Sequence, residues 1–278
     1  MNFMQAGTES GSQGRSRTTD TRMFSTGHRE FHASQMAHDP TENHLLALLA
    51  PEERERIFPH LQLVNMPLGK VLYESGDPLR YAYFPADCIV SLLYVLPDGA
   101  SAELSVVGNE GLAGISHFMG RKTTLNRAIV QSAGFAYRII GQRLKDEFQR
   151  NEKFQGLFLR YVQAVIVQIA QTVVCNRLHS IDQQLCRWLL LSLDRLSSNE
   201  LTMTQKLIAN LLGIRRESVT EAAGKLQKFG VIGYSRVHIT VLDRPKLEQM
   251  SCECYAVVRK ETDRLLQHVP PRICAAVA

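Results

Sequence analysis

Between residues 213 and 221, a glycine is followed by two adjacent basic residues and then by a run of polar and acidic ones. Arg215 and Arg216 carry guanidinium groups, which bind phosphate or hold guanine through O6 and N7. Glu217 and Glu221 carry carboxylates, which can accept a hydrogen bond from cytosine N4. A helix that presents these side chains on one face could therefore contact base edges in the major groove of DNA.

Two short helices must position these groups. The first is expected from about Thr204 to Leu212, with Gly213 ending it in the left-handed conformation. The second is expected from about 215 to 229, and its apolar residues recur at helical spacing: Val219, Ala222, Ala223 and Leu226. This spacing predicts a helix-turn-helix, with a plain helical hairpin as the alternative. Residues 231–242 (VIGYSRVHITVL) then predict two strands around a turn, and the T-x-x-Q form of residues 202–205 predicts a capping box.

The charge of the chain is unevenly distributed. Residues 204–246 contain eight Lys or Arg and three Asp or Glu, a net of +5, whereas residues 41–149 contain ten and twelve, a net of −2. A basic segment on a mildly acidic body is typical of a polyanion-binding module, and the alternative is an ordinary solvated face.

The region 41–149 opens with a short helix around HLLALLAPEERERIF and continues with seven short apolar runs separated by turn signals. Many short strands at close intervals predict an antiparallel barrel or jelly roll. The LPDG of residues 96–99 predicts a hairpin, because Asp-Gly readily adopts the conformation of a tight turn.

Helical periodicity begins near residue 150. One apolar stripe is formed by Phe158, Val162, Val165, Ile169 and Val173, and a second stripe lies beside it. Two stripes on a long helix favour one that packs on its own domain and on a partner helix at once, with a simple buried helix as the alternative. A separate amphipathic helix is expected within residues 180–196.

Other features restrict the function. The six cysteines contain no CxxC pair, and Cys252 and Cys254 are expected on one C-terminal helix, where alternate residues point about 200° apart and would not share a metal ion.

No apolar run reaches the roughly 20 residues of a membrane span, and no secretory signal opens the chain, so a cytoplasmic protein is expected. Residues 1–40 and 269–278 are expected to be tails, the first of them disordered. The strands lack the histidine pattern of a cupin and the chain lacks GxSxG, so no enzyme is expected.

The sequence resembles the Crp–Fnr superfamily of bacterial transcription regulators over roughly residues 42–268. The resemblance rests on GIRRESVTEAAGKLQKFGVI and the preceding TQKLIANLL, and on VLYESGDP and YAYFPADCIVSLLYVLPDG in the N-terminal half. It implies an α+β protein. A double-stranded β-helix (jelly-roll) sensor domain like those that bind cyclic nucleotides would span 41–149, a dimerisation helix 150–179, and a winged helix-turn-helix domain 180–268. It also implies a homodimer that binds double-stranded DNA and contacts RNA polymerase.

The resemblance further implies which residues contact ligands. The implied DNA-binding residues are Thr204, Gln205, Arg215, Arg216, Glu217, Ser218, Thr220, Glu221 and Arg236. The implied effector-binding residues are Gly114, Arg127 and Ala128. Gly114 and Ala128 replace the family's ribose-binding glutamate and hydroxyl residue, so the cyclic-nucleotide pocket is degenerate and no cofactor is certain. A ligand-sensing or interaction protein without DNA binding is the alternative function.

Overall fold

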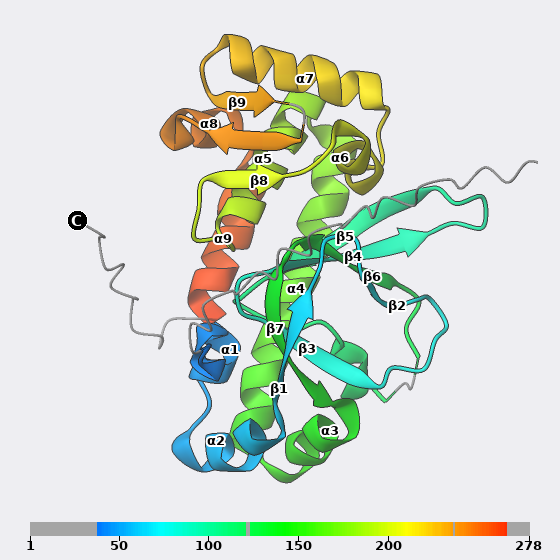
Figure 1. Ribbon diagram of the computed structural model, residues 1–278, viewed down its shortest axis with the longest axis vertical. Helices are drawn as coiled ribbons and strands as arrows, with labels where there is room; N and C mark the ends of the chain where they lie inside the picture. The colour runs from blue at the N-terminus through cyan, green and yellow to red at the C-terminus, as the bar shows by residue number, and fades with distance from the viewer. Residues whose placement is uncertain (1–37, 121–122, 236, 266–278) are drawn as a thin grey trace, which may run out of the picture. The chain divides into compact units, whose positions relative to one another are not determined.

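The computed structural model describes residues 38–120, 123–235 and 237–265. The C-terminal tail and the N-terminal tail up to residue 37 lie outside this range. The element order is two small helical turns, a strand-rich region, three helices, and a C-terminal region of mixed helices and strands (Figure 1).

The seven expected strands of the N-terminal half are all present, in two antiparallel sheets. Their bounds are β1 Gln62–Met66, β2 Val71–Tyr73, β3 Tyr81–Pro85, β4 Ile89–Val95, β5 Ser101–Val107, β6 Arg127–Ser132 and β7 Gly134–Ile140. One sheet has the order β1-β7-β3 and the other β2-β6-β4-β5. The expected hairpin joins β4 to β5 and is closed by the amide of Leu96, which donates to the carbonyl of Ala100 at 2.8 Å.

The helix expected at the start of this region is divided in two. α1 (His44–Ala47) and α2 (Pro51–Ile57) are separate because Pro51 has no backbone N–H to continue the first helix and instead opens the second. After β7, the helix α3 (Gly141–Arg150) was not expected from the sequence.

The long helix is α4 (Glu152–Leu178), which Asn151 caps through the amides of Lys153 and Phe154. Its length and composition alone would allow a membrane span, but it packs against α3, α9 and β5, and one third of its most apolar window is buried. α5 (Ile181–Leu193) follows directly, with a capping box formed by Ser180 and Gln183.

The C-terminal region contains a three-stranded sheet of order β8-β10-β9, two helices before the hairpin and two after it. Their bounds are β8 Glu200–Thr202, α6 Gln205–Leu212, α7 Arg216–Lys228, β9 Ile232–Ser235, β10 His238–Val241, α8 Arg244–Met250 and α9 Glu253–Leu265. The capping box predicted at residues 202–205 is wrong, because Thr202 pairs with His238 inside the sheet and Thr204 is the cap. The single C-terminal helix is also wrong, because the chain leaves helical geometry between α8 and α9.

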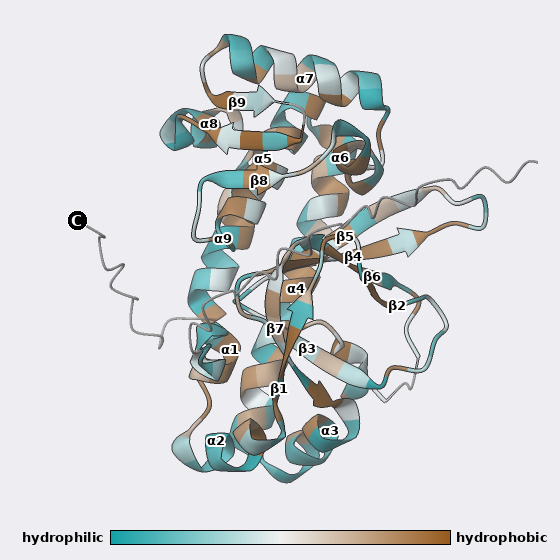
Figure 2. Cartoon of the chain, in the orientation of Figure 1, coloured by the Kyte–Doolittle hydropathy of each residue, from teal (hydrophilic) through white to brown (hydrophobic). Residues whose placement is uncertain are grey.

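The largest hydrophobic cluster joins the two halves of the chain. It contains most of α5 and the buried faces of α6 and α7, and it also includes Ile89, Leu93 and Val106 from β4 and β5. In the hydropathy colouring, hydrophobic residues run through α5 and the strand region, while hydrophilic residues occupy much of α7 (Figure 2). The C-terminal helices thus rest on the β4–β5 pair through apolar side chains.

Candidate nucleic-acid interface

The two central helices of the C-terminal region have the predicted bounds. Thr204 caps α6, because its Oγ1 accepts a hydrogen bond of 3.1 Å from the amide of Leu207. Gly213 ends α6 with φ +67°, a left-handed backbone conformation that is energetically unfavourable for residues other than glycine. Arg215 stands at the N-cap of α7 with no side-chain cap, so its guanidinium is not used in holding the helix.

The buried and exposed faces of α7 are the predicted ones. The four apolar residues at helical spacing are between 0% and 2% exposed and pack in the core with α6: Val219, Ala222, Ala223 and Leu226. The predicted contact residues lie on the other face and are exposed, apart from the half-exposed Ser218: Arg215, Arg216, Glu217, Thr220 and Glu221. The apolar face therefore fixes the helix, and the polar face is free to meet a ligand.

A hydrogen bond joins the polar faces of α6 and α7. The Thr220 hydroxyl lies 2.8 Å from Gln205 Oε1 and 3.0 Å from the Arg216 carbonyl oxygen. Both oxygens are acceptors, and the hydroxyl has a single proton to donate to them. The Gln205 oxygen is thus held against α7, which leaves its NH₂ group as a donor at the rim of this face.

Glu221 belongs to a small charge network. Its carboxylate lies 3.1 Å from Lys225 Nζ, one turn later on α7, and Lys225 also contacts Asp182 of α5 at 3.2 Å. These carboxylates raise the pKa of Lys225, with the hydrogen bond to Glu221 as the largest cause. The Glu221 side chain remains 72% exposed, so it is an accessible acceptor on the same face as Arg216 and Arg215.

The hairpin β9–β10 is the predicted wing and lies beside α7. Gln227 of α7 donates to the carbonyl of Tyr234 in β9 at 3.1 Å. Burial raises the pKa of Tyr234, and the positive charge of Arg216 acts against this shift. Arg236, the predicted wing contact, lies outside the described residues.

The three predicted effector residues lie at two places: Gly114 in the connection between β5 and β6, and Arg127 and Ala128 in β6. Gly114 has φ +115°, and a Cβ there would approach Ala82 Cα of β3 at 3.3 Å, so a glutamate would be strained at this position. Arg127 and Ala128 begin strand β6 of the sheet β2-β6-β4-β5. The Arg127 guanidinium is bound by Glu74 at 2.7 Å, and Ala128 is fully buried. The arginine that would hold a cyclic phosphate therefore already has an anionic partner.

Glu110 has a different role from that of a ribose ligand. Its Oε1 accepts from Arg195 Nε at 2.7 Å, and both side chains are at most 10% exposed. Its Oε2 accepts from the amide of Gly108 at 3.0 Å. The carboxylate thus connects the strand-rich half to the end of α5, which leads into the C-terminal region.

The predicted dimer stripe of α4 is only partly exposed. Phe158 and Val165 are 0% and 5% exposed because they pack in the core of their own chain, and Val162 and Ile169 are half-buried. Val173 is 63% exposed, and two other apolar residues are exposed at seven-residue intervals before it: Leu159 and Ile166, each 52%. The exposed seam of α4 therefore consists of Leu159, Ile166 and Val173. Leu159 and Ile166 each follow a residue of the predicted stripe by one position, because Phe158 and Val165 are buried in the core of their own chain.

The predicted placement of Cys252 and Cys254 on one helix is wrong. Cys252 precedes α9 and Cys254 lies in its first turn, so the two thiols are not directed apart by a shared helix. They meet Cys175 and His179 at the end of α4. Burial raises the pKa of Cys175 to about 12 and of Cys254 to about 11. The sequence signal for this group was a C-x₃-H pair at helical spacing, Cys175 and His179, together with a distant C-x-C pair, Cys252 and Cys254.

Comparison with known proteins identifies the C-terminal region. Residues 183–250 match the model of the Crp-like helix-turn-helix domain. No match was found among curated proteins.

Solved structures resemble the chain over most of their own length. FixK2 from Bradyrhizobium japonicum is 14% identical with a TM-score of 0.59, covering 69% of this chain and 98% of its own. TTHB099, a transcriptional regulator of the CRP family from Thermus thermophilus, is 18% identical with a TM-score of 0.58, covering 68% and 96%. CLP from Xanthomonas campestris, a regulator responsive to c-di-GMP, is 17% identical with a TM-score of 0.53, covering 69% and 99%.

These likenesses extend over both halves of the chain, the strand-rich half included. Residues 183–250 thus belong to the Crp-like helix-turn-helix domain family, and the chain as a whole has the fold of the solved Crp/Fnr regulators.

Proposed function

We propose that the protein acts as a homodimer that reads a roughly palindromic operator with α7, under the control of an effector-type N-terminal domain. The observation that carries the proposal is the exposed polar face of α7, held by four buried apolar residues on its other side. Arg216 is proposed to grip a base and Arg215 a phosphate, because Arg216 is the first residue of α7 whereas Arg215 is its N-cap, outside the helical turns.

The homodimer is proposed to form through α4. Leu159, Ile166 and Val173 recur every seven residues on the exposed side of a 27-residue helix, which is the spacing of a coiled-coil seam. Two copies joined there would present two α7 helices about 34 Å apart, one turn of B-DNA. The symmetry of the protein would then be repeated in the operator.

The proposed role is binding rather than catalysis, in the cytoplasm, with RNA polymerase as a further partner. The solved relatives differ in effector, since CLP is described as responsive to c-di-GMP. The pairing of Arg127 with Glu74 and the backbone at Gly114 argue against a cyclic mononucleotide held in the usual way. The effector domain is therefore proposed to respond to another signal.

The direct test is selection of bound sites from random DNA by the purified full-length protein. An enriched motif with two inverted half-sites, about 10 base pairs from centre to centre, is the expected result. Retention of DNA without any enriched motif would contradict sequence-specific reading. No retention of DNA would favour the alternative, a ligand-sensing or interaction protein without DNA binding. A single unrepeated half-site would contradict the homodimer while leaving the role of α7 intact.

A further inference from the structure

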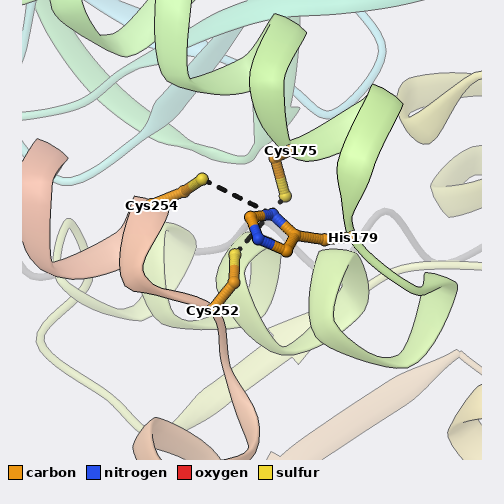
Figure 3. A group of neighbouring side chains, drawn as sticks. All are labelled: Cys175, His179, Cys252 and Cys254. Atoms are coloured by element: carbon orange, nitrogen blue, oxygen red, sulfur yellow. Dashed lines mark hydrogen bonds between the residues drawn. The ribbon is translucent and has the colours of Figure 1, made fainter.

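A compact group of three cysteines and one histidine lies where the long helix ends. Cys175 belongs to the last turn of α4 and His179 is its C-cap, while Cys252 and Cys254 come from the break before α9 and its first turn. The four side chains converge from the two segments, with the sulfur atoms around the imidazole ring (Figure 3). All four potential ligand atoms lie within 4.8 Å of one another.

Two of the separations between these atoms match the edges of a mononuclear tetrahedral site. Zinc–sulfur bonds of about 2.3 Å and zinc–nitrogen bonds of about 2.05 Å give tetrahedral edges of about 3.8 Å between two sulfurs and about 3.6 Å between sulfur and nitrogen. The observed separations are 3.6 Å for Cys175 Sγ to Cys252 Sγ and 3.6 Å for Cys254 Sγ to His179 Nδ1. An iron–sulfur cluster would need wider spacing, because its own iron and sulfide ions separate the cysteines.

The surroundings of the histidine favour metal binding through Nδ1. Its other nitrogen, Nε2, lies 3.2 Å from a carboxylate oxygen of Glu253. A carboxylate that accepts from the distal N–H of a metal-binding histidine fixes the tautomer and the ring orientation. Glu253 stands between the two cysteines of the C-x-C pair, so the same short segment supplies two thiols and the orienting group.

The charge balance also fits. Three thiolates and one Zn²⁺ leave a single negative charge, which is costly to bury alone. Arg187 of α5 is 5% exposed, and its guanidinium acts electrostatically on both Cys175 and Cys254. One of its nitrogens donates to Thr172 at 2.9 Å, whereas its buried Nε has no hydrogen-bond partner among the described residues.

We propose that Cys175, His179, Cys252 and Cys254 bind one zinc ion. The three sulfurs are nearly or fully buried and the ligand set is complete, as in structural rather than catalytic zinc sites. The ion would clip the start of α9 to the end of α4, two residues before α5 begins. It would thereby fix the joint at which the central helix gives way to the DNA-binding region, and this proposal stands independently of which operator is read.

The test uses the full-length protein, purified under reducing conditions and reconstituted with Zn²⁺ or Co²⁺. One zinc per chain is expected by elemental analysis. With Co²⁺, we expect thiolate-to-cobalt charge-transfer absorption and the intense visible bands of a tetrahedral ion. Cys252→Ser should reduce bound zinc to below about a tenth of an equivalent in competition with a chelator. Cys88→Ser, which alters another buried cysteine far from the group, should retain the full equivalent. Glu253→Gln should keep the stoichiometry but lower the affinity about tenfold or more.

Several outcomes would overturn the proposal. One is a reconstituted protein that holds no metal although all its thiols react once it is unfolded. Another is a disulfide between Cys175 and Cys252 that persists through purification under reducing conditions. A third is equal zinc retention by Cys252→Ser and Cys88→Ser. If Cys252→Ser does not fold, as judged by circular dichroism, the cobalt spectrum of the wild-type protein decides alone. Octahedral, thiolate-free cobalt bands in that spectrum would refute the site.

Discussion

The indole Nε1 of Trp188 in α5 donates a hydrogen bond of 3.1 Å to Oε1 of Glu103 in β5, so the helix that leads into the helix-turn-helix region is bonded to the N-terminal sheet β2-β6-β4-β5. The other carboxylate oxygen lies 2.7 Å from the Ser91 hydroxyl, which itself lies 2.6 Å from Gln131 Oε1. Ser91 has one proton and cannot donate to both. A protonated Glu103 resolves this, because it donates to Ser91 and leaves Ser91 to donate to Gln131.

The first prediction concerns pH. Burial raises the pKa of Glu103 to about 7, while hydrogen bonding of Ser91 to the ionised carboxylate and the charges of Arg187 and Arg195 act in the opposite direction. Between pH 4.5 and 7 the unfolded chain releases this proton while the folded chain keeps it, so stability falls as pH rises through this window and levels off above it. The loss is at most about 3 kcal/mol.

This pH dependence can be measured by denaturant unfolding at about pH 5, 6, 7 and 8, with Trp188 fluorescence as the local probe, since Trp188 is the only tryptophan. Glu103→Gln, which resembles the protonated acid, should be flatter than the wild type across this range. Parallel profiles for the two proteins would show that Glu103 does not titrate there.

The second prediction separates the two arginines of α7. Arg216→Ala should cost about 1–3 kcal/mol of operator affinity and relax the preference at one base pair in each half-site, because a base contact is lost. Arg215→Ala should weaken binding to all sequences alike and lower the salt slope by about one. Both can be measured by fluorescence anisotropy over a salt series.

Arg150→Ala, an exposed arginine on α3, is the matched control and should change neither quantity. An unchanged operator affinity for Arg216→Ala at fixed salt would remove Arg216 from the base-reading role.

The third prediction concerns the seam on α4. Ile166→Asp places a charge in the middle of the exposed stripe and should weaken self-association by roughly a hundredfold, without unfolding the chain. Phe158→Ala should instead destabilise the fold by about 3–5 kcal/mol, since Phe158 is fully buried. Sedimentation velocity and thermal unfolding distinguish the two effects. A dimer that tolerates Ile166→Asp would place the interface elsewhere.

The fourth prediction concerns cyclic nucleotides. Because Arg127 is paired with Glu74 and position 114 lacks a carboxylate, cyclic AMP and cyclic GMP should show no micromolar binding by calorimetry. Glu74→Gln frees the guanidinium and is the informative companion variant. Micromolar binding by the wild-type protein would contradict this assignment.

The sequence was sufficient to predict those features that depend on a local pattern of residues. The seven strands, the LPDG turn, Gly213 and the apolar face of α7 all depend on neighbours a few residues away, and all were confirmed. The choice of which α4 stripe is buried depends on tertiary packing, since Phe158 and Val165 share a cluster with Phe84 of β3 and Leu144 of α3, and the stripe containing them was accordingly misassigned.

The group of three cysteines and one histidine was not predicted, for the same physical reason. The chain leaves helical geometry just before Cys252, and Cys175 lies 77 residues away from it in sequence. The interactions that unite them are tertiary, so neither the C-x₃-H nor the C-x-C spacing carries much information alone.

The hydrophobic cluster that unites α5, α6 and α7 with β4 and β5 bears on how such a regulator can be re-engineered. A DNA-reading half cut away before Ser180 would leave Leu189 and its neighbours facing water where Ile89, Leu93 and Val106 now lie. Grafting this half onto another sensor would therefore require the β4–β5 hairpin to travel with it. The unit of exchange between such proteins is thus larger than the helix-turn-helix domain.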